Sequence, residues 1–358
     1  MKPTPYSFEI WTNSGLRLAD ISPLLKDRQY SITRNDVETL EASVDINEIS
    51  SFASSIGTSA RSLLLPYQNN IRVKRGSTYL FGVQIISSTP SFNSNSQDIA
   101  MKCSGYLNLF KDRYITKDYS ATESTSIATD HITTTNTDSD TGVTINASQY
   151  ATGVTHDKSY PRNNVKDNIK NLSNLTGSKF DFAFSADKVF TTYEALGAVR
   201  GDFKLMWGPN GNIKSYSVEQ VLPYNRITCL GSGFGQDQIT SIQNDATSQS
   251  TYYLREKIIQ YNSVSVQTTL DDHAASDLDD YKDLRYIPVL TTTGSLLPST
   301  FLSVGDKVFL DLTANAYTNN ILGWYRIEKM EVSLDANDYE QDINLYFDNK
   351  DVDQDEGA

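Results

Sequence analysis

Side chains suited to nucleophilic catalysis are few in this sequence. There are three histidines, His131, His156 and His273, and none lies in a local catalytic motif. A serine or cysteine nucleophile needs such a base within hydrogen-bond reach. The glycine-rich run at 231–235 (GSGFG) lacks the GxSxG spacing of a nucleophile elbow, and no GxGxxG or GxxxxGK(S/T) phosphate loop occurs. We interpret the glycine run as a tight β turn or a close crossing of two chain segments.

Two acidic stretches have carboxylates that could bind a metal ion. Residues 351–357 (DVDQDEG) begin like a calcium loop, but the glycine comes one place late and no glutamate follows at the twelfth position. We interpret them as part of an acidic tail. Residues 138–142 (DSDTG) could offer carboxylates to an ion, and they are equally typical of a plain Asx turn.

Carboxylates and aromatic residues could also serve a carbohydrate site. Six aspartates surround a helical pattern in residues 270–284: Asp271, Asp272, Asp277, Asp279, Asp280 and Asp283. Paired carboxylates can cleave glycosides, but we expect an ordinary solvated helix because nothing apolar flanks these residues to raise a pKa. The aromatic residues that could form a sugar platform are Trp11, Trp207, Trp324, Tyr252 and Tyr253. Each occupies a strand-like position where an aromatic ring normally packs in a core or interface.

The sequence therefore predicts no catalytic, cofactor-binding or metal-binding residue, and a protein that is not an enzyme. A net charge of −13 disfavours nucleic-acid phosphates and anionic membranes as partners. Cys103 and Cys229 are too few for a disulfide framework, and we expect buried thiols. Because no signal peptide and no run of 18 apolar residues is visible, we expect a soluble protein that is made in the cytoplasm.

Alternating apolar residues predict strands over most of the chain. The 358 residues suffice for two or three domains, and 38% hydrophobic with 11% aromatic residues suits thin sandwich or barrel cores. Residues 301–347 have period two with turns between the strands, which predicts an antiparallel meander that curls into a small barrel. Residues 70–87 follow the same plan, with a turn at Arg75-Gly76 and a bulge or bend at Gly82.

Helices and turns are predicted between these strands. We expect helices in 47–60, 163–177 and 270–284, and either a frayed helix or a surface excursion in 120–142. A turn at 209–212 should join strands at 204–207 and 213–216, and Pro288 should place the strand 285–291 at a sheet edge. The predicted fold is mainly β: a first β-barrel domain (1–105), a mixed α/β insertion (106–260), a second β-barrel domain (261–348) and an acidic disordered tail (349–358).

Several short motifs, taken in order, resemble the baseplate hub or tail-tip proteins of tailed bacteriophages. They are LLLP (63–66), IRVKRG (71–76) and LFGVQI (80–85), followed by YLRE (253–256), the helix around 274–284, LSVGDKV (302–308) and GWYRI (323–327). The motifs extend over nearly the full chain. The resemblance implies a homotrimeric structural virion protein of the tail tip, assembled in the host bacterial cytoplasm, with two similar β-barrels per subunit separated by an α/β insertion.

Such a hub would connect the hexameric tail tube to the distal tip and act in tail assembly and DNA passage. The implied partners are tail-tube and distal tail proteins, the tape measure protein, and a tip fibre or spike protein, without specific nucleic-acid binding or stable membrane insertion. The alternative hypothesis is a cell-surface β protein that binds or cleaves carbohydrate, with the aspartate-rich helix or the tryptophans as its site.

Overall fold

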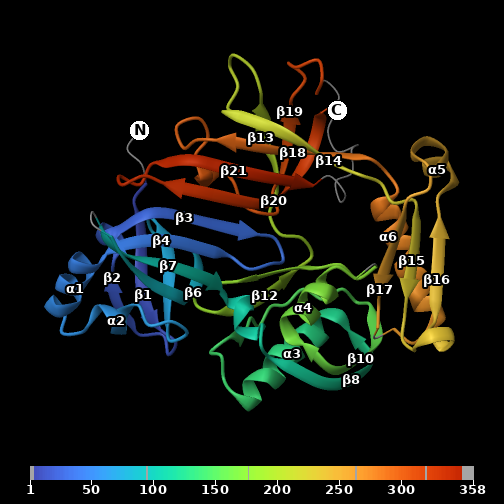
Figure 1. The fold of residues 1–358 in the computed structure, drawn as a ribbon, viewed down its shortest axis with the longest axis horizontal. Coiled ribbons are helices and arrows are strands. Elements are labelled where there is room, and N and C mark those ends of the chain that lie inside the picture. The colour runs from blue at the N-terminus through green and yellow to red at the C-terminus, as the bar shows by residue number, and fades with distance from the viewer. Residues whose placement is uncertain (1–3, 94–95, 176, 263, 319–320, 349–358) are drawn as a thin grey trace.

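The computed structural model describes residues 4–93, 96–175, 177–262, 264–318 and 321–348. Four parts can be followed in Figure 1: an N-terminal β unit (4–105), a middle unit (106–198), an outer module (222–284) and a C-terminal β unit (199–221 with 285–348). The chain is mainly β, as predicted. The acidic tail at 349–358 lies outside the described residues.

The described part of the N-terminal β unit consists of seven strands, one 3₁₀ helix and two short α-helices. Its strands are β1 (Tyr6–Thr12), β2 (Arg17–Asp20), β3 (Leu25–Thr33), β4 (Thr39–Asp45), β5 (Asn69–Arg75), β6 (Thr78–Phe92) and β7 (Gln97–Gly105), with η1 (Ser22–Leu24), α1 (Ile46–Ser55) and α2 (Ala60–Leu63). The Asp45 carboxylate caps α1 by accepting from the Asn47 and Glu48 backbone N–H groups. The predicted β5–β6 hairpin is confirmed, with Gly76 at φ 59° in its turn.

The C-terminal β unit contains the predicted meander, which is confirmed. Its elements are β13 (Val199–Met206), β14 (Ser215–Val221), β18 (Arg285–Thr292), η4 (Ser299–Phe301), β19 (Lys307–Asp311), β20 (Leu322–Leu334) and β21 (Glu340–Asp348). Strands β19, β20 and β21 pair antiparallel in sequence order.

The two β units share one sheet. β20 pairs with β3 from Lys329 opposite Thr33 to Ser333 opposite Gln29, and the resulting 13-stranded sheet runs from β14 to β2. One hydrophobic core spans both units. The prediction of two barrels is therefore not confirmed, because the sheet of the described residues does not close: its main strand order ends at β14 and β2, and a branch from β20 through β19 ends at β13. Joining β3 to β20 satisfies backbone groups that two separate edges would have left unpaired.

Two local predictions need correction. The turn at 209–212 forms, but its flanking strands do not pair with each other: β13 is parallel to β19 and β14 is antiparallel to β18. Residues 199–221 thus hydrogen-bond to the C-terminal strands. β18 lies between β14 and β21, so it is not an edge strand. β21 pairs only with Val289–Thr292 of this strand, so Pro288 has a neighbouring strand, β14, on one side only.

The middle unit and outer module supply most of the helix. The middle unit comprises η2 (Tyr106–Phe110), β8 (Tyr114–Glu123), α3 (Ser124–Asp138), β9 (Thr144–Ile145), β10 (Thr155–Asn164), α4 (Val165–Ser173), β11 (Asp181–Phe184) and β12 (Val189–Tyr193). The outer module comprises β15 (Arg226–Leu230), η3 (Gly235–Asp237), β16 (Thr240–Asn244), α5 (Ala246–Tyr252), β17 (Glu256–Gln260) and α6 (Gln267–Tyr281). The helices predicted in 163–177 and 270–284 are confirmed, and 120–142 contains a regular helix.

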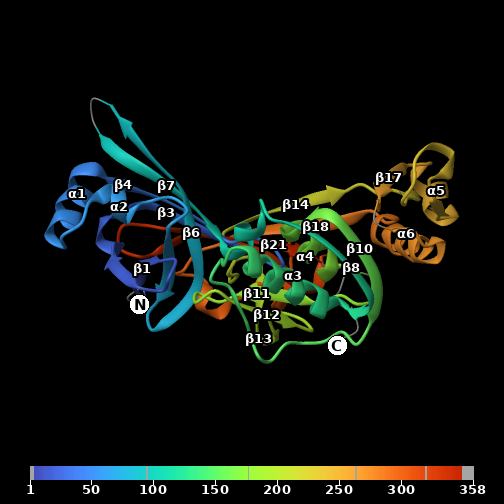
Figure 2. The same cartoon turned by 90° about the horizontal axis from the view of Figure 1, so that it is seen from below.

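The molecule is elongated, with the outer module at one end and the N-terminal β unit at the other (Figure 1). Figure 2 shows the far end of the β6–β7 ribbon extending away from the body, where Phe92 is 68% exposed. Within the described ranges, no helix combines the length and apolar character needed to cross a bilayer.

Candidate functional site

The three histidines lie on different elements and face different neighbours. His131 on α3 is fully buried, with its ring edge-on to Tyr160 at 4.7 Å, and burial lowers its pKa to about 4. His156 on β10 hydrogen-bonds Ser178 Oγ at 2.9 Å, and His273 on α6 stacks on Tyr261 at 4.4 Å. The structure does not bring them together.

The loop motifs have structural explanations. A Cβ on Gly231 would lie 2.7 Å from the Val264 carbonyl oxygen, which confirms a close chain crossing at the glycine run. Asp140 Oδ1 accepts from the Gly142 N–H at 2.8 Å, so residues 140–142 form an Asx turn. No group of three or more potential metal ligands occurs in the part of the chain that the structure describes, and 351–357 lies outside it.

One aspartate of α6 departs from the expectation. Asp271 accepts from Gln267 at 2.9 Å on the exposed side of the helix, as predicted. Asp277, however, is half-buried and accepts from the Tyr261 hydroxyl at 2.8 Å and the Cys229 thiol at 3.4 Å. Burial raises the pKa of Asp277, so the prediction that nothing raises a pKa on this helix is wrong there. The reason is tertiary: β15 and the chain after β17 cover this face of α6. Cys103 and Cys229 are both buried free thiols, as predicted.

The tryptophans pack against separate neighbours. The Arg72 guanidinium lies 3.8 Å from the Trp11 ring, Trp207 contacts Tyr216 at 5.2 Å, and Trp324 contacts Phe309 at 5.6 Å. Packing of this kind was the expected explanation. The prediction of strand positions is wrong for the two tyrosines: Tyr252 is the last residue of helix α5, and Tyr253, which follows it, is 85% exposed.

A polar loop that the sequence did not indicate as functional connects three units of the structure. The junction loop (34–38) joins β3 to β4 and contacts both other large units. Arg34 forms ion pairs of 2.9 Å with Asp181 of β11 and with Glu328 of β20. Asn35 Nδ2 donates to Asp181 Oδ1 at 2.7 Å. Asp36 pairs with Lys170 of α4 at 2.6 Å. This loop therefore anchors the N-terminal β unit to the middle and C-terminal units.

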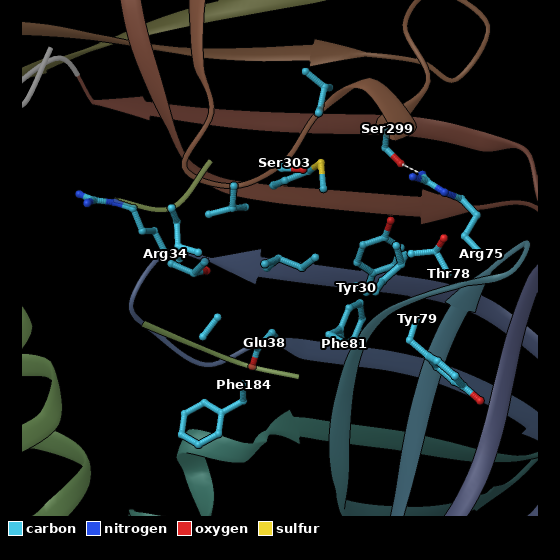
Figure 3. A pocket seen from close by; sticks show the side chains of 18 of the residues that line it. Tyr30, Arg34, Glu38, Arg75, Thr78, Tyr79, Phe81, Phe184, Ser299 and Ser303 are labelled. Atoms are coloured by element: carbon cyan, nitrogen blue, oxygen red, sulfur yellow. Dashed lines mark hydrogen bonds between the residues drawn. The ribbon is translucent and has the colours of Figure 1, made fainter. Parts of the chain in front are cut away.

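Beside this loop lies a cavity of about 500 Å³, here termed the junction cavity, with walls from all three units. In Figure 3, Ser299 and Ser303 lie beside the C-terminal strands, and Glu38 and Phe184 lie on the opposite side. Its apolar lining includes Tyr30, Phe81, Phe182, Phe184, Leu302 and Met330.

A polar network closes one side of the junction cavity. Glu340 Oε1 accepts from Tyr6 Oη at 2.6 Å and from Arg75 at 2.9 Å, and Glu340 Oε2 accepts from the Ser299 N–H at 2.9 Å. Arg75 also donates to Ser299 Oγ (Figure 3). Although burial alone raises the pKa of Glu340, the hydrogen bonds from Ser299 and Tyr6 and the charge of Arg75 lower it on balance. The Glu340 carboxylate is thus ionised, and both of its oxygens accept hydrogen bonds that help to join the two β units.

Glu38 is the cavity's distinctive group. It is 8% exposed, and its Oε2 has no hydrogen-bond partner among the described residues. Burial, with a smaller contribution from Asp36, raises its pKa to about 7. A Cβ on Gly105 would lie 1.9 Å from Oε2, so only glycine leaves room for this side chain. The cavity therefore combines apolar walls with a carboxyl residue whose partnerless oxygen is packed against Gly105.

The polar sequence of 34–38 gave no sign of this role, since loops between strands are usually polar because they are solvated. Partners such as Asp181 are more than a hundred residues away, and no local pattern identifies them.

Comparison with solved structures shows that nearly all of the chain has a fold similar to that of tail proteins. A tail protein from Neisseria meningitidis MC58 superposes with a TM-score of 0.63 at 12% identity, covering 96% of this chain and 97% of that one. The 43 kDa tail protein of prophage MuSo2 from Shewanella oneidensis gives a TM-score of 0.59 at 12% identity, with 96% and 99% covered. The prophage tail protein gp18 from Listeria monocytogenes EGD-e gives 0.56 at 11% identity, with 96% and 95% covered. The sequence matches no protein-family model and no curated protein. The resemblance to phage tail proteins is confirmed at the level of the fold.

Proposed function

We propose that the chain is a structural, non-enzymatic virion protein that forms a homotrimeric hub at the tail tip or baseplate. The observation that carries the proposal is the extent of the structural match: it includes nearly all of this chain and nearly all of each tail protein, so no large domain is left over in either. The local environments of the histidines, aspartates and tryptophans favour no catalytic function.

In this proposal three chains, each with two β units, present six β units to the six-fold end of the tail tube. Closed rings satisfy sheet edges that a single subunit leaves open. Strands β2, β14 and β13 each pair with a single strand among the described residues, and they are the edges that contacts with neighbours, or a barrel-like closure of each unit, would complete. The partners would be tail-tube and distal tail proteins, the tape measure protein, and a tip fibre or spike.

The proposed domain division has β units at 1–105 and 261–348 with a mixed region at 106–260. Two segments cross these boundaries: 199–221 hydrogen-bond to the second β unit, and 264–281 pack with the outer module. The net charge of −13 would help a DNA duplex to pass the hub without binding it, because like charges repel. The protein would be assembled in the host cytoplasm and reside in the virion.

The oligomeric state of the chain in solution tests the proposed hub function. Native mass spectrometry and light scattering should give a trimer, alone or with the tail-tube protein, and a stable monomer under both conditions would contradict the proposal. A glycan array and a polysaccharide digestion assay test the carbohydrate alternative. Binding or cleavage that is lost on Asp271→Asn or Asp279→Asn would favour that alternative instead.

A further inference from the structure

A second cavity, here termed the module cleft, lies between the middle unit and the outer module. Its volume of about 590 Å³ is within the roughly 300–1,000 Å³ typical of ligand sites. One wall comes from β10 and α4 of the middle unit, and the other comes from α6 and the end of β17 in the outer module. In Figure 1, β17 is the outer-module strand on the side of the middle unit.

One edge of β17 is open. The outer-module sheet has the order β16-β15-β17, so β17 pairs with β15 alone among the described strands. The Arg255 carbonyl oxygen and the Tyr261 N–H both hydrogen-bond to β15. Because alternate residues of a strand bond to the same neighbour in a parallel pair, the odd-numbered residues of β17 face β15. The backbone N–H and C=O groups of Ile258 and Gln260 therefore point away from it.

The module cleft lies along this open edge. Ile259 and Gln260 both line the cleft, although successive side chains of a strand point to opposite faces of the sheet. A cavity that touches both side chains lies beside the strand, not above or below the sheet. Unpaired N–H and C=O groups on a strand edge can pair with a further strand. The cleft can thus receive an extended chain segment.

Lys158 gives the cleft a positive charge that lacks a partner. Its ammonium group has no hydrogen bond or ion pair among the described residues, and burial alone lowers its pKa. Its nitrogen is not one of the enclosed polar atoms without a partner, so a ligand can reach it. The other charged residues of the lining all have partners: Arg34, Lys179, Asp277, Asp280 and Asp348.

The middle-unit wall also offers polar groups to the far side of such a segment. Asn163 and Asn171 line the cleft, and their side-chain amides have no hydrogen-bond partner among the described residues. An amide both donates and accepts hydrogen bonds, as the two edges of an extended backbone require.

We propose that the module cleft binds an extended segment of another polypeptide, which pairs with the open edge of β17 and places an acidic side chain against Lys158. Backbone hydrogen bonds to Ile258 and Gln260 supply affinity, and the Lys158 ammonium group selects the acidic residue through a charge-assisted hydrogen bond. A lysine at the same position of the segment meets a like charge. The binding requires no particular assembly, so it stands independently of the proposed hub function.

Isothermal titration calorimetry on the full chain tests this with the heptapeptide Ac-TVTETVT-NH2, whose residues favour strands, and with its counterparts that carry Gln or Lys at the centre. We expect the glutamate peptide to bind with a Kd below about 1 mM and about fivefold more tightly than the glutamine peptide. Lys158→Gln should remove this difference. Lys111→Gln is the matched control, because Lys111 is exposed on the same unit and does not line the cleft.

Backbone methylation tests strand pairing separately from the charge. Methyl groups on the second, fourth and sixth backbone nitrogens of the glutamate peptide, or on the first, third, fifth and seventh, remove the N–H groups from one edge at a time. The set that faces β17 should weaken binding by at least about tenfold. If both methylated peptides bind as tightly as their parent, the segment does not pair with β17 and the proposal is wrong.

A second variant keeps the test valid if Lys158→Gln does not fold. Asn171→Trp adds bulk from an exposed position on α4, leaves Lys158 and β17 in place, and should abolish binding of the glutamate peptide. Absence of binding by all three peptides would overturn the proposal. Equal binding of the glutamate and lysine peptides, or unchanged binding in both variants, would overturn it as well. Hexanoate that binds as tightly as the glutamate peptide would assign the cleft to a small carboxylate instead.

Discussion

Arg34 donates to Asp181 at 2.9 Å across 147 residues of chain, and this pair joins the N-terminal β unit to the middle unit. Asp181 is 2% exposed and also accepts from Asn35 and from the Leu196 N–H, each at 2.7 Å. One buried carboxylate thus holds the junction loop, β11 and the chain leading to β13 in place.

Removal of this carboxylate should strongly destabilise the protein. Asp181→Ala leaves Arg34 with one partner fewer and leaves Asn35 Nδ2 only its longer bond of 3.5 Å to the Phe180 carbonyl oxygen. Breaking a buried pair of this kind costs about 3–5 kcal/mol. Chemical denaturation measures the change. Asp279→Ala is the control, since Asp279 is 76% exposed in its pair with Lys282 and its loss should be barely detectable. Equal effects of the two substitutions would contradict the role of Asp181.

Glu38 should make the protein less stable as the pH rises through neutrality. Its pKa is about 7 in the folded protein against 4.5 ordinarily, so the folded state holds the proton more firmly. The stabilisation is complete below pH 4.5 and is lost as the pH rises to about 7, for a total of roughly 3 kcal/mol. Unfolding free energies from pH 4.5 to 8 should therefore fall in the native protein relative to Glu38→Gln. Parallel pH profiles would disprove this.

His131 should make the protein less stable as the pH falls below 6.5, whereas Glu38 does so as the pH rises. Burial lowers its pKa from 6.5 to about 4, so the unfolded chain takes up a proton that the folded protein resists. Stability should decline as the pH falls from 6.5 to 4. His131→Phe keeps a ring between Tyr119 and Tyr160 without a titrating group, and its thermal unfolding should depend less on pH in this range. If the stability of His131→Phe falls with decreasing pH as steeply as that of the native protein, His131 does not cause the pH dependence.

Gly82 should tolerate no side chain. A Cβ there would lie 2.4 Å from Tyr106 Oη and 2.8 Å from Tyr106 Cζ, and Tyr106 is 1% exposed. Gly82→Ala should cost about 1–3 kcal/mol through overpacking. In a Tyr106→Phe background the cost should be smaller, because the nearest clashing atom is gone. Gly201→Ala, with no atom within 4 Å of its added Cβ, controls for the change of residue type.

Much of the secondary structure could be predicted, because it depends on local pattern. The alternation in Val308, Leu310 and Leu312 points three buried side chains to one side, whatever the strand's neighbours are. The spacing of Val165, Ile169 and Leu172 likewise defines a buried helix face. Gly82 was predicted as a bulge or bend. The register shift lies nearby, between Val73 and Lys74, and the glycine itself makes room for Tyr106.

The sequence by itself determined that the chain is mainly β, where its hairpins turn, and that its order of motifs resembles phage tail proteins. Only the tertiary structure decided that β3 pairs with β20, that β13 and β14 join the C-terminal strands, and that Glu38 and Asp181 become buried at a junction of three units. The physical reason is that periodicity specifies which face of a strand is apolar but does not specify which edge lies beside it. The burial of a polar loop depends on surfaces supplied by distant segments, and burial is what changes the chemistry of its carboxyl groups.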